Sequence, residues 1–171
     1  MTWPQTPMND FMDWLARPTP RWAGGAAAAI VAAEGWALVA MTFGIVHKKH
    51  PLLGLEDFIA QAILSRDQSL SLAAADVAAT TALSHDRRDE AMAEATRIPL
   101  AILKLAQAGK HALKHPARSK LPQAEPDFGT AEALFTACET STRLIITANL
   151  PAIKGPVRDV LAHELDRLTE C

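Results

Sequence analysis

Hydrophobic positions along the chain fall into long segments with helical spacing, separated by prolines, glycines and short charged clusters. No sustained stretch alternates apolar and polar residues, as a strand with one buried face would. The pattern therefore predicts an all-α chain in which five to six helices pack as a bundle. The segments expected to be helical are residues 10–16, 26–46, 55–83, 84–115, 127–149 and 157–168.

The most apolar segment follows a turn rich in proline and glycine. Pro18-Thr19-Pro20 and Gly24-Gly25 precede the run AAAIVAAEGWALVAM. Proline and glycine disfavour helix interiors and alanine favours them, so we expect a loop that leads into a buried helix near Ala26. The first N–H groups of such a helix lack internal partners, and glycine lets other groups approach them closely. The junction is therefore suited to holding an anion or another ligand.

The apolar run from Ala23 to Val46 is long enough to span a bilayer, but its composition indicates a core helix of a soluble protein. Alanine and glycine gain little from hydrocarbon, and Glu34 lies near the middle of the run. Asp10 and Asp13 precede the run without a basic cluster, so we expect neither a signal peptide nor a membrane partner. We expect part of this helix to face another copy of the chain. We also expect Glu34 to pair with a basic residue, to lie at a subunit boundary or to reach a cleft.

Length and charge limit the classes of protein to which the chain can belong. With 171 residues and 49% hydrophobic content, it is expected to form one globular domain over residues 1–171. A net charge of -2 argues against a nucleic-acid-binding protein. Cys138 and Cys171 are too few for a disulfide framework, which favours the cytoplasm. His111 and His115 lie one turn apart without an acid or cysteine to complete a ligand set, so no metal site is expected.

Two acids and one basic pair are candidate functional residues. Asp76 lies in LSLAAADVAATTAL, far from other charges, so it is either exposed at an edge or paired in a cleft. Asp127 is placed to cap the helix that follows it, which would be a structural role. Lys48 and Lys49 end the apolar helix, where the helix dipole favours positive charge. They either terminate that helix or bind an anionic ligand.

Several short motifs occur in the order in which one known family has them. The matches are Pro18-Thr19-Pro20 with Gly24-Gly25, the basic pair Lys48-Lys49, the interior acid Asp76, Ala95-Thr96 with Pro99-Leu100, Pro126-Asp127, and Ala148-Asn149-Leu150. In this order the chain resembles the formiminotetrahydrofolate cyclodeaminase and methenyltetrahydrofolate cyclohydrolase family, whose hallmark is PTPGGGS. The resemblance spans nearly the whole chain.

The chain departs from the family pattern in the loops expected to build the site. Arg21-Trp22 is inserted after the first motif, and Ala26 replaces the serine of PTPGGGS. A family Gly-Asn pair falls on Lys120-Leu121, and Pro126 replaces the serine before Asp127. These departures indicate a diverged member of the family.

The resemblance implies an up-and-down helical fold, a homodimer and a folate substrate held in a cleft. It implies hydrolysis of methenyltetrahydrofolate, or cyclisation of formiminotetrahydrofolate with release of ammonia, and no metal. Asp76 and Asp127 are the candidate catalytic residues, and we expect both to line one cavity beneath the turn that contains Gly24-Gly25. The candidate substrate-binding residues are Gly24, Gly25, Lys48, Lys49 and Asn149.

Two other classes of function stay open from the sequence. One is a diverged family member that binds a pterin or a protein partner without catalysis. The other is a helical assembly protein with no small ligand.

Overall fold

The computed structural model describes residues 8–17, 24–81 and 88–169. Within these ranges the chain forms α-helices and short 3-10 helices and no strand. The α-helices are α1 (Met8–Leu15), α2 (Gly24–Lys49), α3 (Glu56–Thr81), α4 (Arg88–Ala112), α5 (Glu125–Asn149) and α6 (Pro156–Arg167). The 3-10 helices are η1 (Pro51–Leu53), η3 (Pro116–Lys120), η4 (Pro122–Ala124) and η5 (Leu150–Ala152). The motif Pro18-Thr19-Pro20 and the inserted Arg21-Trp22 lie outside the described residues.

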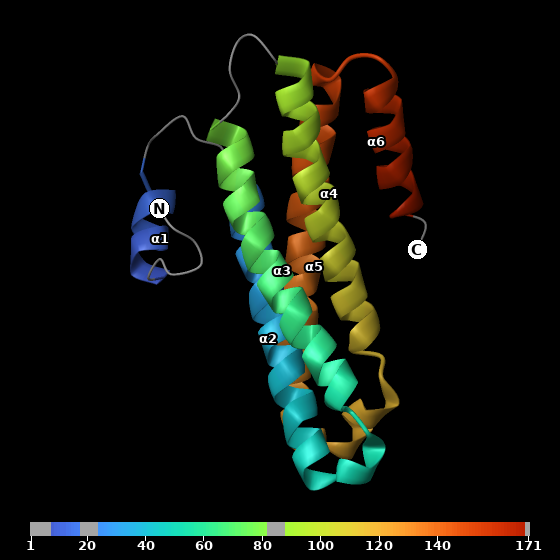
Figure 1. The fold of residues 1–171 in the computed structure, drawn as a ribbon. Coiled ribbons are helices and arrows are strands. Elements are labelled where there is room, and N and C mark those ends of the chain that lie inside the picture. The colour runs from blue at the N-terminus through green and yellow to red at the C-terminus, as the bar shows by residue number, and fades with distance from the viewer. Residues whose placement is uncertain (1–7, 18–23, 82–87, 170–171) are drawn as a thin grey trace.

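Four long helices, α2 to α5, run alternately down and up along one bundle axis (Figure 1). The start of α2, the end of α3, the start of α4 and the end of α5 share the upper end of the bundle in that view. The end of α2, the start of α3 and the start of α5 share the lower end. Helix α6 turns back beside α4, and α1 stands to one side of the bundle. The predictions of an all-α chain and of an up-and-down helical bundle are confirmed.

Helix α2 supplies much of the core. Its buried side chains include Val39, Phe43 and Val46, and it packs mainly against α3 and α5. The Phe43 ring packs edge-on against Phe58 of α3 and Phe128 of α5. By length and composition α2 could cross a membrane, but 56% of its most apolar window is buried inside the bundle. Its apolar character is therefore used largely for packing between helices.

The starts of α2 and α5 bear on the candidate residues, and both differ from the sequence prediction. Helix α2 begins at Gly24, so both glycines lie in its first turn instead of in the preceding loop. Helix α5 begins at Glu125 after Ala124, because Pro126 is compatible with the first turn of a helix. The prediction that Asp127 caps α5 is therefore wrong, since this residue lies inside the first turn.

Candidate functional site

The first turn of α2 lies directly against Asp76 of α3. The Ala26 N–H donates a hydrogen bond of 2.8 Å to Asp76 Oδ2. Asp76 is only 2% exposed, which excludes the alternative of a carboxylate at an exposed edge. Its partner is the N-terminus of a helix, where unpaired N–H groups and the helix dipole both favour a negative charge.

Gly25 makes this contact possible. A β-carbon at position 25 would lie 2.1 Å from Asp76 Oδ1 and 2.5 Å from Cγ, well inside van der Waals contact. Only glycine lets the helix backbone approach the carboxylate so closely. The diglycine and the interior acid, which are 50 residues apart in the chain, therefore form one structural unit.

Burial dominates the electrostatics of Asp76. Desolvation raises the pKa of its carboxyl to about 6, against a smaller lowering by the Ala26 hydrogen bond. A carboxylate with this pKa is a stronger base near neutral pH than an ordinary aspartate. Such perturbed groups cluster at functional sites, which makes Asp76 the best-supported candidate among the described acids.

Asn149 lies at the same end of the bundle, and its amide has an internal partner. A β-carbon on Gly24 would lie 3.3 Å from Cδ1 of Ile145, one turn before Asn149 on α5. Asn149 Nδ2 donates a 3.3 Å hydrogen bond to the Ala95 carbonyl of α4. Pro99, four residues further along α4, has no N–H to bond that carbonyl. The Asn149 side chain therefore satisfies a group that the Ala-Thr-x-x-Pro-Leu motif leaves unpaired, a role that the sequence prediction missed.

The other candidates lie at the opposite end of the bundle (Figure 1). Lys48 and Lys49 are exposed at the end of α2, and Asp127 is half-buried at the start of α5. The next residue, Phe128, packs on Phe43, and α2 rises about 27 Å between Gly25 and Phe43. Within one chain the structure therefore does not bring Asp127 to Asp76, and the expected convergence of the two acids is not found.

Other described groups do not add to the site. A surface hollow of about 690 Å³ lies along the outer face of α5, and none of the candidate residues lines it. Cys138 is buried, and desolvation raises the pKa of its thiol to about 12, so it is unsuited to nucleophilic chemistry. Among the described residues, no three His, Cys, Asp or Glu side chains are grouped as metal ligands.

The protein is an up-and-down helical bundle. In it, the buried carboxylate of Asp76 on α3 accepts a hydrogen bond from the first turn of α2, where Gly24 and Gly25 lie. A family model described as formiminotransferase-cyclodeaminase matches residues 7–165, and the chain belongs to this family. The crystal structure of formiminotetrahydrofolate cyclodeaminase from Thermotoga maritima is similar, with a TM-score of 0.82 and 21% sequence identity. The match covers 97% of this chain and 89% of that one. A comparison of the sequence with curated proteins finds no match.

Proposed function

We propose that this chain is a folate-dependent one-carbon enzyme and that Asp76 acts in its catalytic site. Family membership supports the substrate class, and the observation that carries the proposal is the buried Asp76 carboxylate on the first turn of α2. The reaction is either hydrolysis of methenyltetrahydrofolate or cyclisation of formiminotetrahydrofolate with release of ammonia. We place the protein in the cytoplasm and its reaction among those that need no metal.

Both reactions require one positioned acid–base group. In the hydrolysis, water adds to the cationic amidinium carbon, loses a proton, and one C–N bond of the ring then breaks to leave a formyl group. In the cyclisation, the N10 nitrogen of the folate adds to the formimino carbon and ammonia leaves. A carboxylate can stabilise the cationic carbon and accept the proton as the tetrahedral adduct forms. A pKa of about 6 suits Asp76 to this proton transfer at neutral pH.

The first turn of α2 supplies the complementary groups. N–H groups of a first helical turn have no intrahelical acceptor and can bind oxygens of a pterin or of its tail. Gly24 is exposed and presents no side chain there, so a ligand can approach the backbone. Gly24, Gly25 and Asp76 together are the proposed binding surface, with Asn149 holding the adjoining α4–α5 contact in place.

Enzyme kinetics can show whether the reaction takes place at the Asp76 end or at the Asp127 end of the bundle. We would measure loss of methenyltetrahydrofolate by absorbance, and ammonia release from formiminotetrahydrofolate, for the wild type and for Asp76→Asn and Asp127→Asn. General-base catalysis contributes about 10²–10⁴-fold, so Asp76→Asn should lower kcat by at least about 100-fold. Asp67→Asn, an exposed acid on the same helix, is the matched control and should be unaffected.

The outcomes separate the alternatives. A wild-type protein with no rate above background for either substrate would refute the enzyme assignment. If Asp127→Asn alone abolished turnover, the chemistry would lie at the lower end of the bundle. Loss on Asp76→Asn with normal activity of Asp127→Asn would support the proposal.

A diverged binding protein is the second candidate, and one observation favours it. Ala26 offers only its backbone N–H, already bonded to Asp76, where the serine of the PTPGGGS hallmark would stand. Binding of a folate by calorimetry without turnover of either substrate would support this candidate, and efficient turnover would exclude it.

A further inference from the structure

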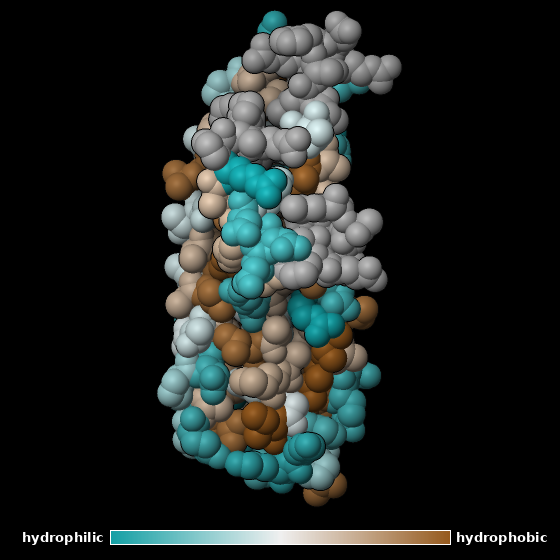
Figure 2. Space-filling view, turned by 90° about the vertical axis from the view of Figure 1, so that its left-hand side faces the viewer, coloured by the Kyte–Doolittle hydropathy of each residue, from teal (hydrophilic) through white to brown (hydrophobic). Residues whose placement is uncertain are grey.

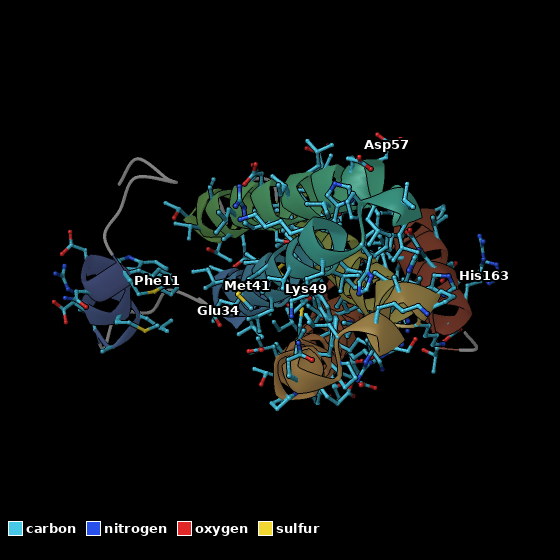
Figure 3. All side chains as sticks on the ribbon, turned by 90° about the horizontal axis from the view of Figure 1, so that it is seen from below. Phe11, Glu34, Met41, Lys49, Asp57 and His163 are labelled. Carbon is cyan, nitrogen blue, oxygen red and sulfur yellow. The ribbon has the colours of Figure 1, made fainter. Side chains whose placement is uncertain are left out.

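Helix α6 lies at the margin of the bundle, beside α4 (Figure 1). Leu161 is its only buried residue, while Val157 is 39% exposed and Val160 is 64% exposed. In Figure 3, His163 points away from the bundle. No side chain caps the start of α6, and a helix of 12 residues is only marginally stable in water on its own. The helix therefore depends on its contacts with the bundle.

The apolar contacts of α6 form a cluster of their own. Leu161 lies in one cluster with Leu100 and Leu103 of α4, Ile146 of α5 and Ile153. The main core of α2 to α5 is a separate cluster. Parts of a protein that share few buried side chains open separately from one another. Detachment of α6 would therefore expose the smaller cluster and leave the main core intact.

The C-terminal end of α6 is held through one backbone carbonyl. The Leu168 oxygen accepts a 2.6 Å hydrogen bond from Gln107 Nε2 of α4 and a 2.5 Å hydrogen bond from Arg143 Nη2 of α5. Arg143 also donates to Thr169 Oγ1. The dipole of α6 favours a cation at this end of the helix. We call Gln107 and Arg143 the clasp of α6.

The chain enters α6 through a glycine that is suited to be a hinge. Ile153 is buried and anchors the segment before it, and Gly155 has a φ of 70°. This conformation is strained for a residue with a side chain. A β-carbon at Gly155 would have no neighbour within 4 Å, so packing does not restrict this position. Rotation at Gly155 would move α6 as a unit, because the helix begins at the next residue.

We propose that α6 is a strap that opens about Gly155 and closes on the clasp, while α2 to α5 stay folded. When the strap is open, Leu100, Leu103 and Ile146 line an exposed apolar groove between α4 and α5. When it is closed, Leu161 fills the groove and the clasp binds the Leu168 carbonyl.

The opposite side of the bundle carries exposed apolar residues in the folded state. Figure 2 looks onto this side, where hydrophobic residues lie uncovered over the lower half. Met41 and Glu34 lie on it in Figure 3, and Met41 is 45% exposed. Opening of the strap would create a second face of this kind without disrupting the main core.

Helix α5 links the strap to the candidate site, and this step rests on the proposed function. Ile146 lies in the cluster under the strap, and Cδ1 of its neighbour Ile145 lies 3.3 Å from the position of a β-carbon on Gly24. An open strap leaves one side of this turn of α5 without support. A ligand bound at the first turn of α2 should therefore favour the closed strap, and by linkage the closed strap should favour binding of the ligand.

Hydrogen–deuterium exchange of the full chain, measured by mass spectrometry, tests the strap without any ligand. The amides of α6 should exchange at least about 100-fold faster than those of α2, by local opening. Arg143→Ala should speed exchange in α6 about tenfold and leave α2 unchanged, because the closed strap loses a hydrogen bond to a charged group. Arg97→Ala is the matched control, since this exposed arginine pairs with Glu94 on its own helix. It should leave exchange in α6 unchanged.

A second variant acts on the hinge. Gly155→Ala strains the closed conformation without a clash, so it should also speed exchange in α6 about tenfold. Exchange in wild-type α6 that is as slow as in α2 would overturn the proposal. Equal exchange of α6 in Arg143→Ala and Arg97→Ala would overturn the clasp.

Tetrahydrofolate tests the link to the candidate site separately. At saturation, verified by calorimetry, it should slow exchange in α6 about fivefold. Binding of tetrahydrofolate with unchanged exchange in α6 would overturn the link, whereas the strap would still be supported by the ligand-free result. Absence of binding would overturn the proposed function and the link together.

Discussion

The contact between Gly25 and Asp76 makes a strong prediction for Gly25→Ala. The new methyl group would lie 2.1 Å from Asp76 Oδ1 and 2.7 Å from Oδ2, so the carboxylate must move and its bond to the Ala26 N–H must break. Asp76 is buried, and its carboxylate would lose a charge-assisted hydrogen bond without gaining water in return.

The size of the effect follows from three terms. Overpacking a buried site costs about 1–3 kcal/mol. Loss of a hydrogen bond to a charged group costs about 1.5–3 kcal/mol. The higher helix propensity of alanine offsets this destabilisation by up to about 1 kcal/mol. The net destabilisation of Gly25→Ala should be about 3 kcal/mol, which for a chain of this size lowers the Tm by about 6–12 °C.

The neighbouring glycine is the control. A β-carbon at Gly24 would lie 3.3 Å from the terminal Cδ1 of Ile145, which can give way by a small side-chain adjustment. Gly24→Ala should therefore change the free energy of unfolding by less than about 1 kcal/mol. Urea unfolding followed by circular dichroism at pH 7 measures both variants. Equal stabilities for Gly25→Ala and Gly24→Ala would show that the Asp76 contact does not constrain position 25.

Three further predictions rest on single features of the structure. The raised pKa of Asp76 means that its stabilising contribution is complete below about pH 3.8 and is lost as the pH rises through about 6, since the folded state binds the proton more tightly than the unfolded state. Asp76→Asn should therefore remove the decrease in unfolding free energy between pH 4 and 7, measured by urea titration at each pH. The same decrease in the variant as in the wild type would contradict a raised pKa at Asp76. Phe135→Ala should cost about 3–5 kcal/mol, because the fully buried ring fills the space over Gly35 and Gly109, and a thermal melt with a Tm within 2 °C of the wild type would contradict this packing. Arg118→Ala should cost about 1–2 kcal/mol in urea unfolding, because the half-buried guanidinium lies over the Phe128 ring at 5.1 Å and donates to the Leu113 carbonyl besides pairing with the exposed Glu125; a stability equal to that of the wild type would contradict these contacts.

Several features of the fold could be predicted from local sequence. The spacing of apolar residues predicted the helices, and Pro51, Gly54 and Pro151 marked breaks that the structure has at those positions. Gly54 adopts a left-handed conformation with φ of 59°, which glycine tolerates without strain. Helix starts were predicted less well, because Gly24 and Pro126 are compatible with a first turn although both are unfavourable in a helix interior.

The candidate site was predicted only in part. From its isolated position among apolar residues, Asp76 was expected either at an exposed edge or paired in a cleft, and the structure pairs it with the α2 N-terminus. The hydrogen bond from Asn149 to the Ala95 carbonyl was not predicted, although Pro99 implied an unpaired carbonyl four residues before it. The partner of that carbonyl lies on another helix, and spacing along the chain does not indicate which one.

The sequence alone determined the all-α class and the apolar core helix and supplied the candidate acids, because these depend on composition and on the local periodicity of apolar positions. Only the tertiary structure decided which of these residues meet. Successive long helices run in opposite directions, so Asp76 near the end of α3 lies beside the start of α2, whereas Asp127 at the start of α5 lies at the far end of the bundle. Which residues meet in a bundle depends on the direction and length of each helix. The residues that flank Asp76 and Asp127 in the sequence do not indicate either.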